Sequence, residues 1–257
     1  MSFSDRLGVA SKAAALHLLG SAIIAGMVAV VVFGLWYPHP YDKLAGGQNL
    51  FLLVLVVHLI CGPALTMILF NPRKPRRELL VDIGLVILLQ SAALVYGVVS
   101  VAQARPVFLA FEGDRFRVVS VADVDIESLP DARPEFRDFS YRGPRIIGVH
   151  LVQPSEPEYV DSIRAALQGL HPAYRPDRWI AYDEVRQGVA NQSRDLSLLR
   201  VRYPDKAALF DKTVEESNRN EDALGFYPVQ AYKTSDWIVI VEREHGEVIS
   251  FLPLDGW

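Results

Sequence analysis

The histidines and the clustered acidic residues are the side chains of this sequence that could bind a metal ion or transfer protons. The six histidines are His17, His39, His58, His150, His171 and His245. None lies three or four residues from another, as two ligands on one helix face would, and no H-E-x-x-H motif occurs. The glycine motifs that bind phosphates or dinucleotides, or that carry a nucleophilic serine, are absent as well. We therefore expect no enzyme activity, no cofactor and no metal ion.

Two acidic clusters have a spacing that could matter. Asp123, Asp125 and Glu127 alternate with apolar residues. In a strand, this spacing would place three carboxylates on one face, where they could bind calcium. A solvated strand face or a loop explains the same pattern with fewer assumptions and is the favoured interpretation. The stretch Glu242–Glu244 is interpreted as a polar strand end and turn.

His58 is the residue most open to a functional interpretation. It lies near the middle of a long apolar segment, and Gly62-Pro63 follow it, which loosens a helix at that point. Ionisable groups at this depth in a membrane are rare and often functional. A neighbouring helix carbonyl or Gln90 could equally satisfy a neutral imidazole, and this structural role is favoured. An intramembrane enzyme that uses His58 and Asp82 ranks last among the alternatives, because the two residues belong to different segments.

Three long apolar segments must position these residues. They are Ala13–Trp36, Leu50–Phe70 and Leu79–Val101, of 24, 21 and 23 residues. A helix rises about 1.5 Å per residue, so each reaches roughly 30 Å, the thickness of the hydrocarbon core. The first segment is too long for a cleaved signal peptide. We predict a three-helix transmembrane domain over residues 1–104, joined at Arg105-Pro106 to a domain of residues 105–257.

The loop between the second and third segments determines the predicted orientation. It carries Arg73, Lys74, Arg76 and Arg77. The connection 37–49 carries only Lys43, and the N-terminal tail carries Arg6 and Lys12. Because Lys and Arg in short loops stay on the cytoplasmic side, the tail and the 71–78 loop are predicted to be cytoplasmic. Residues 105–257 then lie outside, which in a bacterial inner membrane means the periplasm.

The charge distribution separates the same two parts. Residues 1–104 carry seven Lys and Arg against four Asp and Glu, whereas residues 105–257 carry nineteen against twenty-six. Such a split indicates two solvents rather than one mixed globule. The acidic second part argues against a nucleic-acid partner, whose phosphates it would repel. The single cysteine, Cys61, excludes an intramolecular disulfide and a zinc ribbon.

The second part has the pattern of an α+β domain. A hairpin is predicted over residues 107–121 and a strand over 145–152. A helix follows the S-x-x-E capping box of Ser155 and Glu158, and further helices are predicted over 183–190 and 205–216. Three apolar runs near the C-terminus, 226–232, 237–241 and 247–252, are separated by short polar turns. Such turns favour an antiparallel meander, so the sheet of this domain is predicted to be antiparallel.

Small residues at four-residue spacing occur in two of the apolar segments. These are Ala22 and Gly26 in the first segment, and Ala93 and Gly97 in the third. Such pairs allow two helices to approach closely. The contact could be internal to the three-helix domain or could involve a second chain, and a homo-oligomer stays open for the same reason.

Several stretches, in order along nearly the whole chain, resemble the TfpX/TfpZ type IV pilin accessory proteins. The first is GPALTMILFNPRKPRRELL, residues 62–80. The second is QARPVFLAFE, residues 103–112, followed by DRFRVV, residues 114–119. The third is the C-terminus, with DWIVIV at 236–241 and FLPLDGW at 251–257. His58 departs from the resemblance, because the family carries an acidic residue four positions before the Gly-Pro pair.

The resemblance implies an inner-membrane chaperone or accessory protein that acts on a cognate type IV major pilin, without catalytic residues. A type IV pilin has an apolar N-terminal helix in the inner membrane and a globular head in the periplasm. Three spans in the lipid bilayer and a periplasmic domain would offer a surface to each part. A groove lined by Ala22 and Gly26, or by Ala93 and Gly97, would receive the pilin helix. The alternative is a membrane-anchored periplasmic sensor or ligand-binding module, which is disfavoured because only a tail and a short loop face the cytoplasm.

Overall fold

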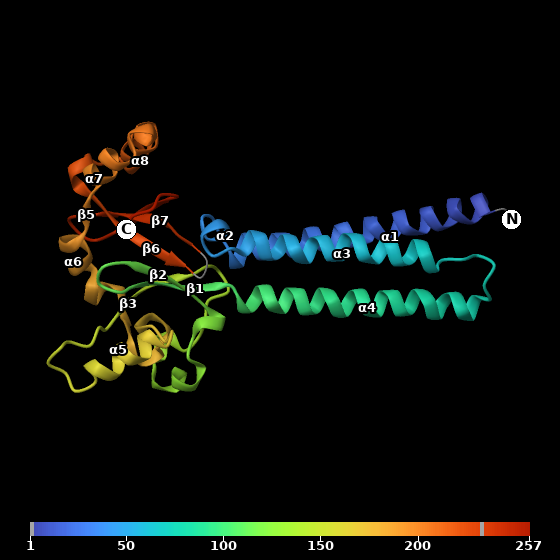
Figure 1. The fold of residues 1–257 in the computed structure, drawn as a ribbon, viewed down its shortest axis with the longest axis horizontal. Helices are drawn as coiled ribbons and strands as arrows, with labels where there is room; N and C mark the ends of the chain where they lie inside the picture. The colour runs from blue at the N-terminus through green and yellow to red at the C-terminus, as the bar shows by residue number, and fades with distance from the viewer. Residues whose placement is uncertain (1–2, 232–233) are drawn as a thin grey trace. The chain divides into compact units, whose positions relative to one another are not determined.

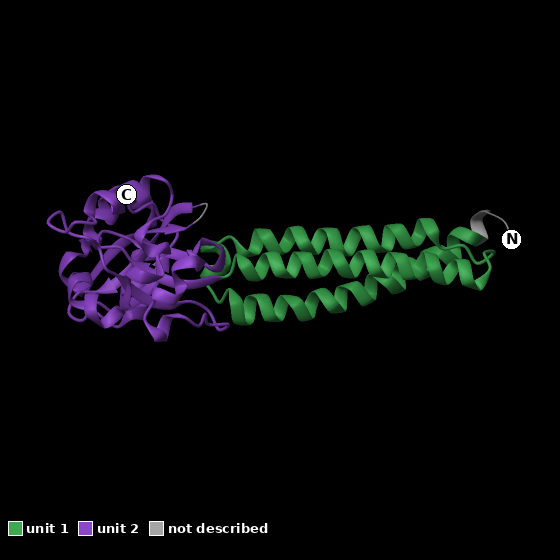
Figure 2. Cartoon of the chain, turned by 90° about the horizontal axis from the view of Figure 1, so that it is seen from below, with its two compact units in different colours: residues 1–105 green, residues 106–257 purple. Residues whose placement is uncertain are grey.

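The computed structural model describes residues 3–231 and 234–257, and the chain forms two compact units, residues 1–105 and 106–257 (Figures 1 and 2). The first unit consists of helices. Its elements are α1 (Phe3–Val31), a π-helical turn (Val32–Trp36), α2 (Tyr41–Leu44), α3 (Gly47–Leu69) and α4 (Arg76–Gln103). The second unit is built on a β-sheet.

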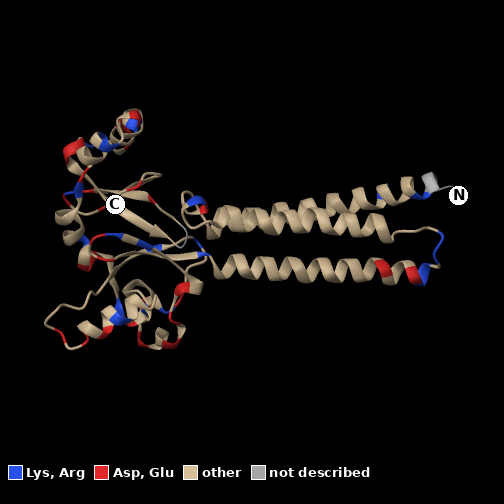
Figure 3. Ribbon diagram, viewed as in Figure 1, with Lys and Arg blue, Asp and Glu red and all other residues tan. Residues whose placement is uncertain are grey.

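The three long helices of the first unit are apolar on all sides. By length and composition, Arg6–Trp36, Gly47–Leu69 and Arg76–Gln103 can each cross a membrane. Only 17 to 22% of the residues in their most apolar windows are buried. Figure 3 shows that Lys, Arg, Asp and Glu are confined to the ends of these helices. A helix that exposes apolar side chains all round is unsuited to water, so the three predicted apolar helices are confirmed and indicate a membrane protein.

Helix α3 is the centre of the helical unit, because α1 and α4 each pack mainly against it. One end of the unit is closed by an apolar cluster of Val32, Tyr37, Phe51 and Val101. The hydroxyl of Tyr37 donates a hydrogen bond to the carbonyl of Val101 at 3.0 Å, which ties the end of α1 to the end of α4. Gly47 is required beneath the Tyr37 ring, since a Cβ there would lie 2.3 Å from Cδ1 of that ring.

The second unit contains eight strands and four helices within the described residues. The strands are β1 (Pro106–Phe111), β2 (Phe116–Ser120), β3 (Arg145–Val149), β4 (Trp179–Ala181), β5 (Arg194–Asp195), β6 (Leu224–Ala231), β7 (Thr234–Glu242) and β8 (Val248–Leu252). The helices are α5 (Tyr159–Leu167), α6 (Tyr182–Gln192), α7 (Leu196–Arg202) and α8 (Ala207–Ser217). The N-terminal apolar helices and the sheet occupy different parts of the chain, so the α+β prediction fits, although helices and strands alternate from β3 to β6.

The strands form one mixed sheet, in the order β4-β3-β1-β2-β6-β7-β8, with β5 paired to β6. The predicted hairpin is β1–β2, and β6, β7 and β8 form the predicted antiparallel meander. The prediction of a wholly antiparallel sheet is wrong, because β1 pairs with β3 and β2 pairs with β6 in parallel. Parallel neighbours need a long crossover, and short turns in a sequence reveal only the antiparallel pairs.

Two apolar cores stabilise the sheet unit. The first surrounds Phe108, whose ring centroid lies 4.7 Å from that of Trp179, and the indole of Trp179 donates to the carbonyl of Ala173 at 2.8 Å. The second packs Leu199 of α7 and Phe210 of α8 against β6 and β7. Strand β1 is buried along its whole length, as expected for a central strand.

Some predicted boundaries differ from the structure. The predicted capping box of Ser155 and Glu158 does not form, because α5 begins at Tyr159 and its N-cap residue, Glu158, makes no side-chain cap. Strand β7 begins at Thr234, three residues before the predicted start at Trp237. The predicted strand 226–232 ends at Tyr232, which lies outside the described residues. Helix α7 was not predicted, since its seven residues show too few turns for a helical period to appear.

Candidate intramembrane binding site

A groove runs between α1 and α4, with α3 as its floor. Its volume is ≈ 430 Å³. The lining residues include Leu16, Gly20 and Ile24 of α1, Thr66 of α3, and Ile87 and Ser91 of α4. We call it the α1–α4 groove. It exists because α1 and α4 both pack against α3 rather than against each other, which leaves the space above α3 uncovered.

The floor of the α1–α4 groove is polar. His17 Nδ1 lies 2.6 Å from the hydroxyl of Thr66. The side-chain amide of Gln90 donates to His58 Nδ1 at 2.8 Å, and the same nitrogen also contacts the carbonyl oxygen of His58. We call His17, His58, Thr66 and Gln90 the polar cluster. It joins all three long helices, so its hydrogen bonds hold the helices together.

Gly62 of α3 makes the polar cluster sterically feasible. A Cβ at this position would lie 2.8 Å from Gln90 Cδ and 2.9 Å from His17 Nε2. Only glycine therefore lets these two side chains from opposite helices lie against α3. The neighbouring Pro63 was predicted to loosen the helix, but α3 continues through it from Gly47 to Leu69.

The protonation of His58 follows from its partner. A primary amide nitrogen can only donate, so His58 Nδ1 accepts and the ring proton is on Nε2. Contact of the same amide nitrogen with the His58 carbonyl, an obligate acceptor, fixes the orientation of the Gln90 side chain. Gln90 is one of the two hydrogen-bond partners that the sequence suggested for His58. His58 is 5% exposed, and its Nε2 has no hydrogen-bond partner among the described residues.

The predicted small-residue positions are distributed over two faces of the helices. Gly97 is buried against α3, where a Cβ would lie 2.6 Å from Val54 Cγ1. Ala93 is exposed and, with Gly97 and His58, lines a second groove of ≈ 380 Å³ between α3 and α4. Gly97 therefore mediates a close approach inside this chain.

Ala22 and Gly26 lie on the outer face of α1. Both are exposed, and a Cβ on Gly26 would meet nothing within 4 Å. The α1 residues that face the bundle are instead Ser21 and Ala25, which are 3% and 5% exposed. Ala22 and Gly26 therefore do not pack against another helix of this chain and do not line the α1–α4 groove, while their prediction as pilin-contact positions stays a prediction. Spacing alone gives the face of a helix but does not say what that face contacts.

The basic residues used to predict orientation lie at one end of the helical unit (Figure 3). Arg73, Arg76 and Arg77 are exposed. Lys74 bonds Asp82 at 2.6 Å and Glu78 at 3.1 Å, and these bonds, the one to Asp82 foremost, raise the pKa of Lys74. Asp82 is therefore held by Lys74, whereas His58 is held by Gln90. The two residues of the lowest-ranked enzyme hypothesis do not form a joint site.

The acidic run after β2 does not form the strand that a calcium site would need. Residues 121–123 and 126–131 are 3₁₀ turns. Asp123 accepts hydrogen bonds from the backbone N–H of Ser120 at 2.8 Å and from its hydroxyl at 2.6 Å. Asp125 accepts from the hydroxyl of Ser128. Both carboxylates stabilise their own turns, in agreement with the loop interpretation.

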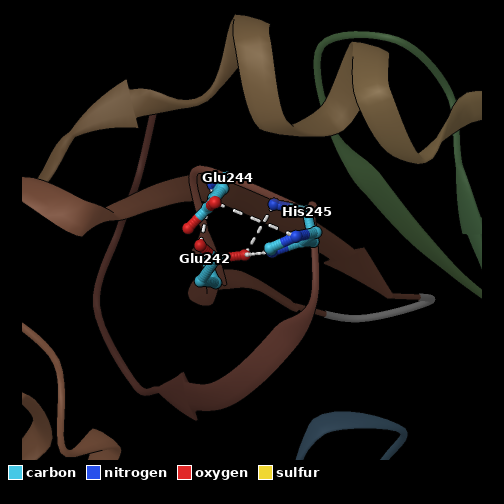
Figure 4. Close-up of side chains that lie close together, drawn as sticks. All are labelled: Glu242, Glu244 and His245. Atoms are coloured by element: carbon cyan, nitrogen blue, oxygen red, sulfur yellow. Dashed lines mark hydrogen bonds and ion pairs between the residues drawn. The ribbon is translucent and has the colours of Figure 1, made fainter.

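Glu242, Glu244 and His245 form a second cluster, at the end of β7 (Figure 4). Their potential ligand atoms lie within 4.8 Å of one another. The buried carboxylate of Glu242 accepts the backbone N–H groups of Glu244 at 2.8 Å and His245 at 2.7 Å. Burial favours the neutral acid, but these two N–H groups, together with the charges of His245 and Arg219, outweigh it and lower the pKa of Glu242. The cluster is explained as a turn stabilised by a carboxylate, as the sequence suggested.

Known proteins resemble this chain over most of its length. Residues 5–46 match the protein family described as "Fimbrial assembly protein FimB". The fimbrial assembly protein of serogroup I from Dichelobacter nodosus is 34% identical over 240 residues, which are 93% of each chain. The serogroup E1 protein is 33% identical over the same length and coverage. No solved structure matches the chain. The similarity over nearly the whole of both chains shows that this chain belongs to the family of the fimbrial assembly protein FimB.

Proposed function

We propose that this protein is a multi-pass protein of the bacterial inner membrane that binds the major subunit of a type IV fimbria and supports its stability or assembly. The observation that carries the proposal is the likeness, over 93% of both chains, to proteins named for fimbrial assembly. The resemblance to TfpX/TfpZ pilin accessory proteins refines it to a chaperone-like role on one cognate pilin. We propose binding rather than catalysis, and the local structural bonds of His58, Asp123 and Glu242 support this choice.

The proposed orientation places the basic loop in the cytoplasm and residues 106–257 in the periplasm. The exposed Arg73, Arg76 and Arg77 support it, because retention of Lys and Arg on the cytoplasmic side governs the insertion of short loops. With this orientation, the apolar helix of a pilin would meet the helical unit in the membrane, and the head of the pilin would meet residues 106–257 in the periplasm.

The binding role is tested by deletion and co-purification. A clean deletion is expected to lower the amount of the major subunit or the number of surface fimbriae, and the tagged protein is expected to co-purify with the subunit from detergent. An unrelated inner-membrane protein with the same tag serves as the control. Unchanged subunit abundance and fimbriation, together with no co-purification, would contradict the proposal.

The orientation has a separate test. A reporter enzyme that is active only outside the cytoplasm is fused after Trp257 and is expected to be active. The same reporter fused within the 71–75 connection is expected to be inactive. The opposite pattern would place residues 106–257 in the cytoplasm, where they could not meet an exported subunit.

A further inference from the structure

We infer that the basic end of the helical unit binds an anionic glycerophospholipid, whose phosphate lies against exposed arginines and whose acyl chain lies along α4. The arginines are Arg73, Arg76 and Arg77, which we call the basic triad (Figure 3). The inference goes beyond the proposed function. It also holds for either orientation of the chain, because a membrane presents headgroups on both of its sides.

The first support is that the basic triad has positive charge to offer. The two carboxylates at the start of α4 are occupied by a lysine, since Lys74 bonds Asp82 at 2.6 Å and Glu78 at 3.1 Å. The three arginines are exposed, and none forms an ion pair with a carboxylate whose side chain the structure describes. Their guanidinium groups are therefore available to an anion from outside the chain.

The second support is the position of the basic triad along the span. Helix α3 ends at Leu69 and α4 begins at Arg76, so the triad occupies the short connection and the first turn of α4. Large apolar side chains are exposed from Leu80 onward, which is 72% exposed. At 1.5 Å per residue, Arg76 lies about 6 Å from Leu80 along the helix axis. The headgroup region beside the hydrocarbon core is roughly 5–8 Å thick, so the guanidinium groups lie at the level of the phosphates.

The third support is an apolar stripe below one of the arginines. Arg77, Val81, Leu85 and Leu88 are spaced by four, four and three residues, which places them on one face of α4. The three apolar members are 62%, 60% and 69% exposed. From Arg77 to Leu88 the helix rises about 16 Å, close to half the thickness of the hydrocarbon core. One lipid molecule can therefore place its phosphate at Arg77 and an acyl chain along the stripe.

The charge and shape of guanidinium select the kind of headgroup. Arginine binds phosphate oxygens through two parallel N–H···O bonds, which a single ammonium cannot do. A zwitterionic headgroup carries a cation that the triad repels, whereas an anionic headgroup does not. The complementary partner is therefore a lipid with net negative charge, and the apolar stripe favours a whole lipid over a free phosphate ion.

Lipid titration of the purified full-length protein in a neutral detergent tests the inference. Phosphatidylglycerol or phosphatidylcholine is added, and bound lipid is counted by native mass spectrometry. Each arginine near a membrane surface contributes about fivefold, so we expect wild type to bind phosphatidylglycerol about 100-fold more tightly than phosphatidylcholine. The double variant Arg76→Gln/Arg77→Gln is expected to reduce this preference about 25-fold.

Two further variants separate the site from net charge and from folding. Lys43→Gln/Arg142→Gln removes two exposed charges elsewhere in the chain and should keep the wild-type preference. Arg76→Lys/Arg77→Lys keeps the charge and should retain most of it. Salt at 1 M shortens the screening length to about 3 Å and should weaken the preference of the unmodified protein, which tests the charge without any substitution.

The other outcomes would overturn the inference. Equal binding of the two lipids by wild type would remove the basic triad as a lipid site. An unchanged preference in Arg76→Gln/Arg77→Gln, or an equal loss in Lys43→Gln/Arg142→Gln, would mean that these arginines do not form it. Displacement of phosphatidylglycerol by an equal concentration of glycerol phosphate would assign the arginines to a soluble phosphate instead of a lipid.

Discussion

The helical unit and the sheet unit distribute apolar and polar side chains in opposite ways. In the helical unit, large apolar side chains such as Leu16 and Leu80 are each 72% exposed, while the polar cluster lies at the centre. In the sheet unit, Phe108 and Phe116 are fully buried, and charged residues are spread over many elements of the unit (Figure 3). The two units are therefore adapted to two solvents, lipid and water. The helical unit buries polar side chains, which lipid solvates poorly, and the sheet unit buries apolar side chains, which water solvates poorly.

The units also differ in the kind of polar group that they bury. In the sheet unit, Glu112 and Arg117 are 7% and 5% exposed and bond each other at 2.7 Å. Glu112 also accepts the backbone N–H of Ala173 at 3.0 Å, so this carboxylate is satisfied within the chain. In the helical unit, His58 keeps one donor without a partner in the described residues. Buried side-chain atoms without a hydrogen-bond partner occur in both units of the described chain, and Arg145 Nε and Ser250 Oγ are examples in the sheet unit. What distinguishes the sheet unit is a buried ion pair that is satisfied within the chain.

The largest expected effect is that of removing Arg117, one member of the buried pair with Glu112. Arg117→Ala leaves the Glu112 carboxylate buried without its counterion, and we expect the free energy of unfolding to fall by about 3–5 kcal/mol. Urea unfolding of the full-length protein in detergent, followed by tryptophan fluorescence, measures it. The reporter suits the sheet unit, because Trp179, Trp237 and Trp257 all belong to it.

The matched control for the buried pair is an exposed one. Arg133 and Glu184 form an ion pair whose side chains are 44% and 45% exposed. Solvent screens such a pair, so Arg133→Ala is expected to change the urea midpoint far less than Arg117→Ala does. Equal small losses for both variants would mean that Glu112 and Arg117 are not buried in solution, and the contrast between the units would fail.

A second test compares two glycines of the helical unit. Gly97→Leu inserts a side chain where a Cβ alone would lie 2.6 Å from Val54 Cγ1, so we expect a loss of about 1–3 kcal/mol from overpacking. Gly26→Leu is the control, since nothing lies within 4 Å of a Cβ there. Helicity measured during titration from mild detergent into dodecyl sulfate reports both. A larger loss for Gly26→Leu would place that face of α1 in a helix contact.

Much of the fold could be predicted because its signals are local. Long apolar runs reveal the three membrane helices, and short polar turns reveal the β1–β2 hairpin and the meander of β6, β7 and β8. The parallel pairs β1–β3 and β2–β6 could not be predicted, because each joins segments that are far apart in the chain. The sequence also did not reveal which small residues contact another helix. Gly97 faces Val54 and Gly26 faces outward, although both belong to the same four-residue pattern.

The candidate site was only partly accessible from the sequence. His58 and Gln90 were linked correctly, because both interrupt apolar segments near their middle. His17 and Thr66 were missed as partners, although polar side chains in a membrane helix usually face the bundle interior, and this rule could have grouped them. The groove itself has no sequence signal. It forms because α1 and α4 both pack against α3, and this arrangement is a property of three-dimensional packing.

A third test concerns pH in the sheet unit. The pKa of Glu242 is lowered below its ordinary value, so its contribution to stability is complete above that value and is lost as the pH falls through the lowered pKa. Glu242→Gln replaces charge-assisted bonds by neutral ones, and we expect it to cost about 1 kcal/mol at pH 7. The difference from wild type should vanish in acid. Urea unfolding at pH 7 and at a series of lower pH values measures it, with the exposed Glu244→Gln as a control that changes little at any pH.

The smallest effect on the free energy of unfolding is expected for a substitution in α5. This helix exposes apolar side chains, unlike the buried central strand β1 of the sheet unit. Val160, Ile163 and Leu167 lie along one face of this helix and are 62%, 45% and 84% exposed. Leu167→Ser should therefore change the free energy of unfolding by less than about 0.5 kcal/mol, whereas Leu199→Ala in the buried core should cost about 2–5 kcal/mol. The urea midpoints of the two variants measure the contrast. If Leu167→Ser cost as much as Leu199→Ala, the apolar face of α5 would be covered in the isolated protein, and the sheet unit would bury its apolar side chains as completely as the comparison assumes.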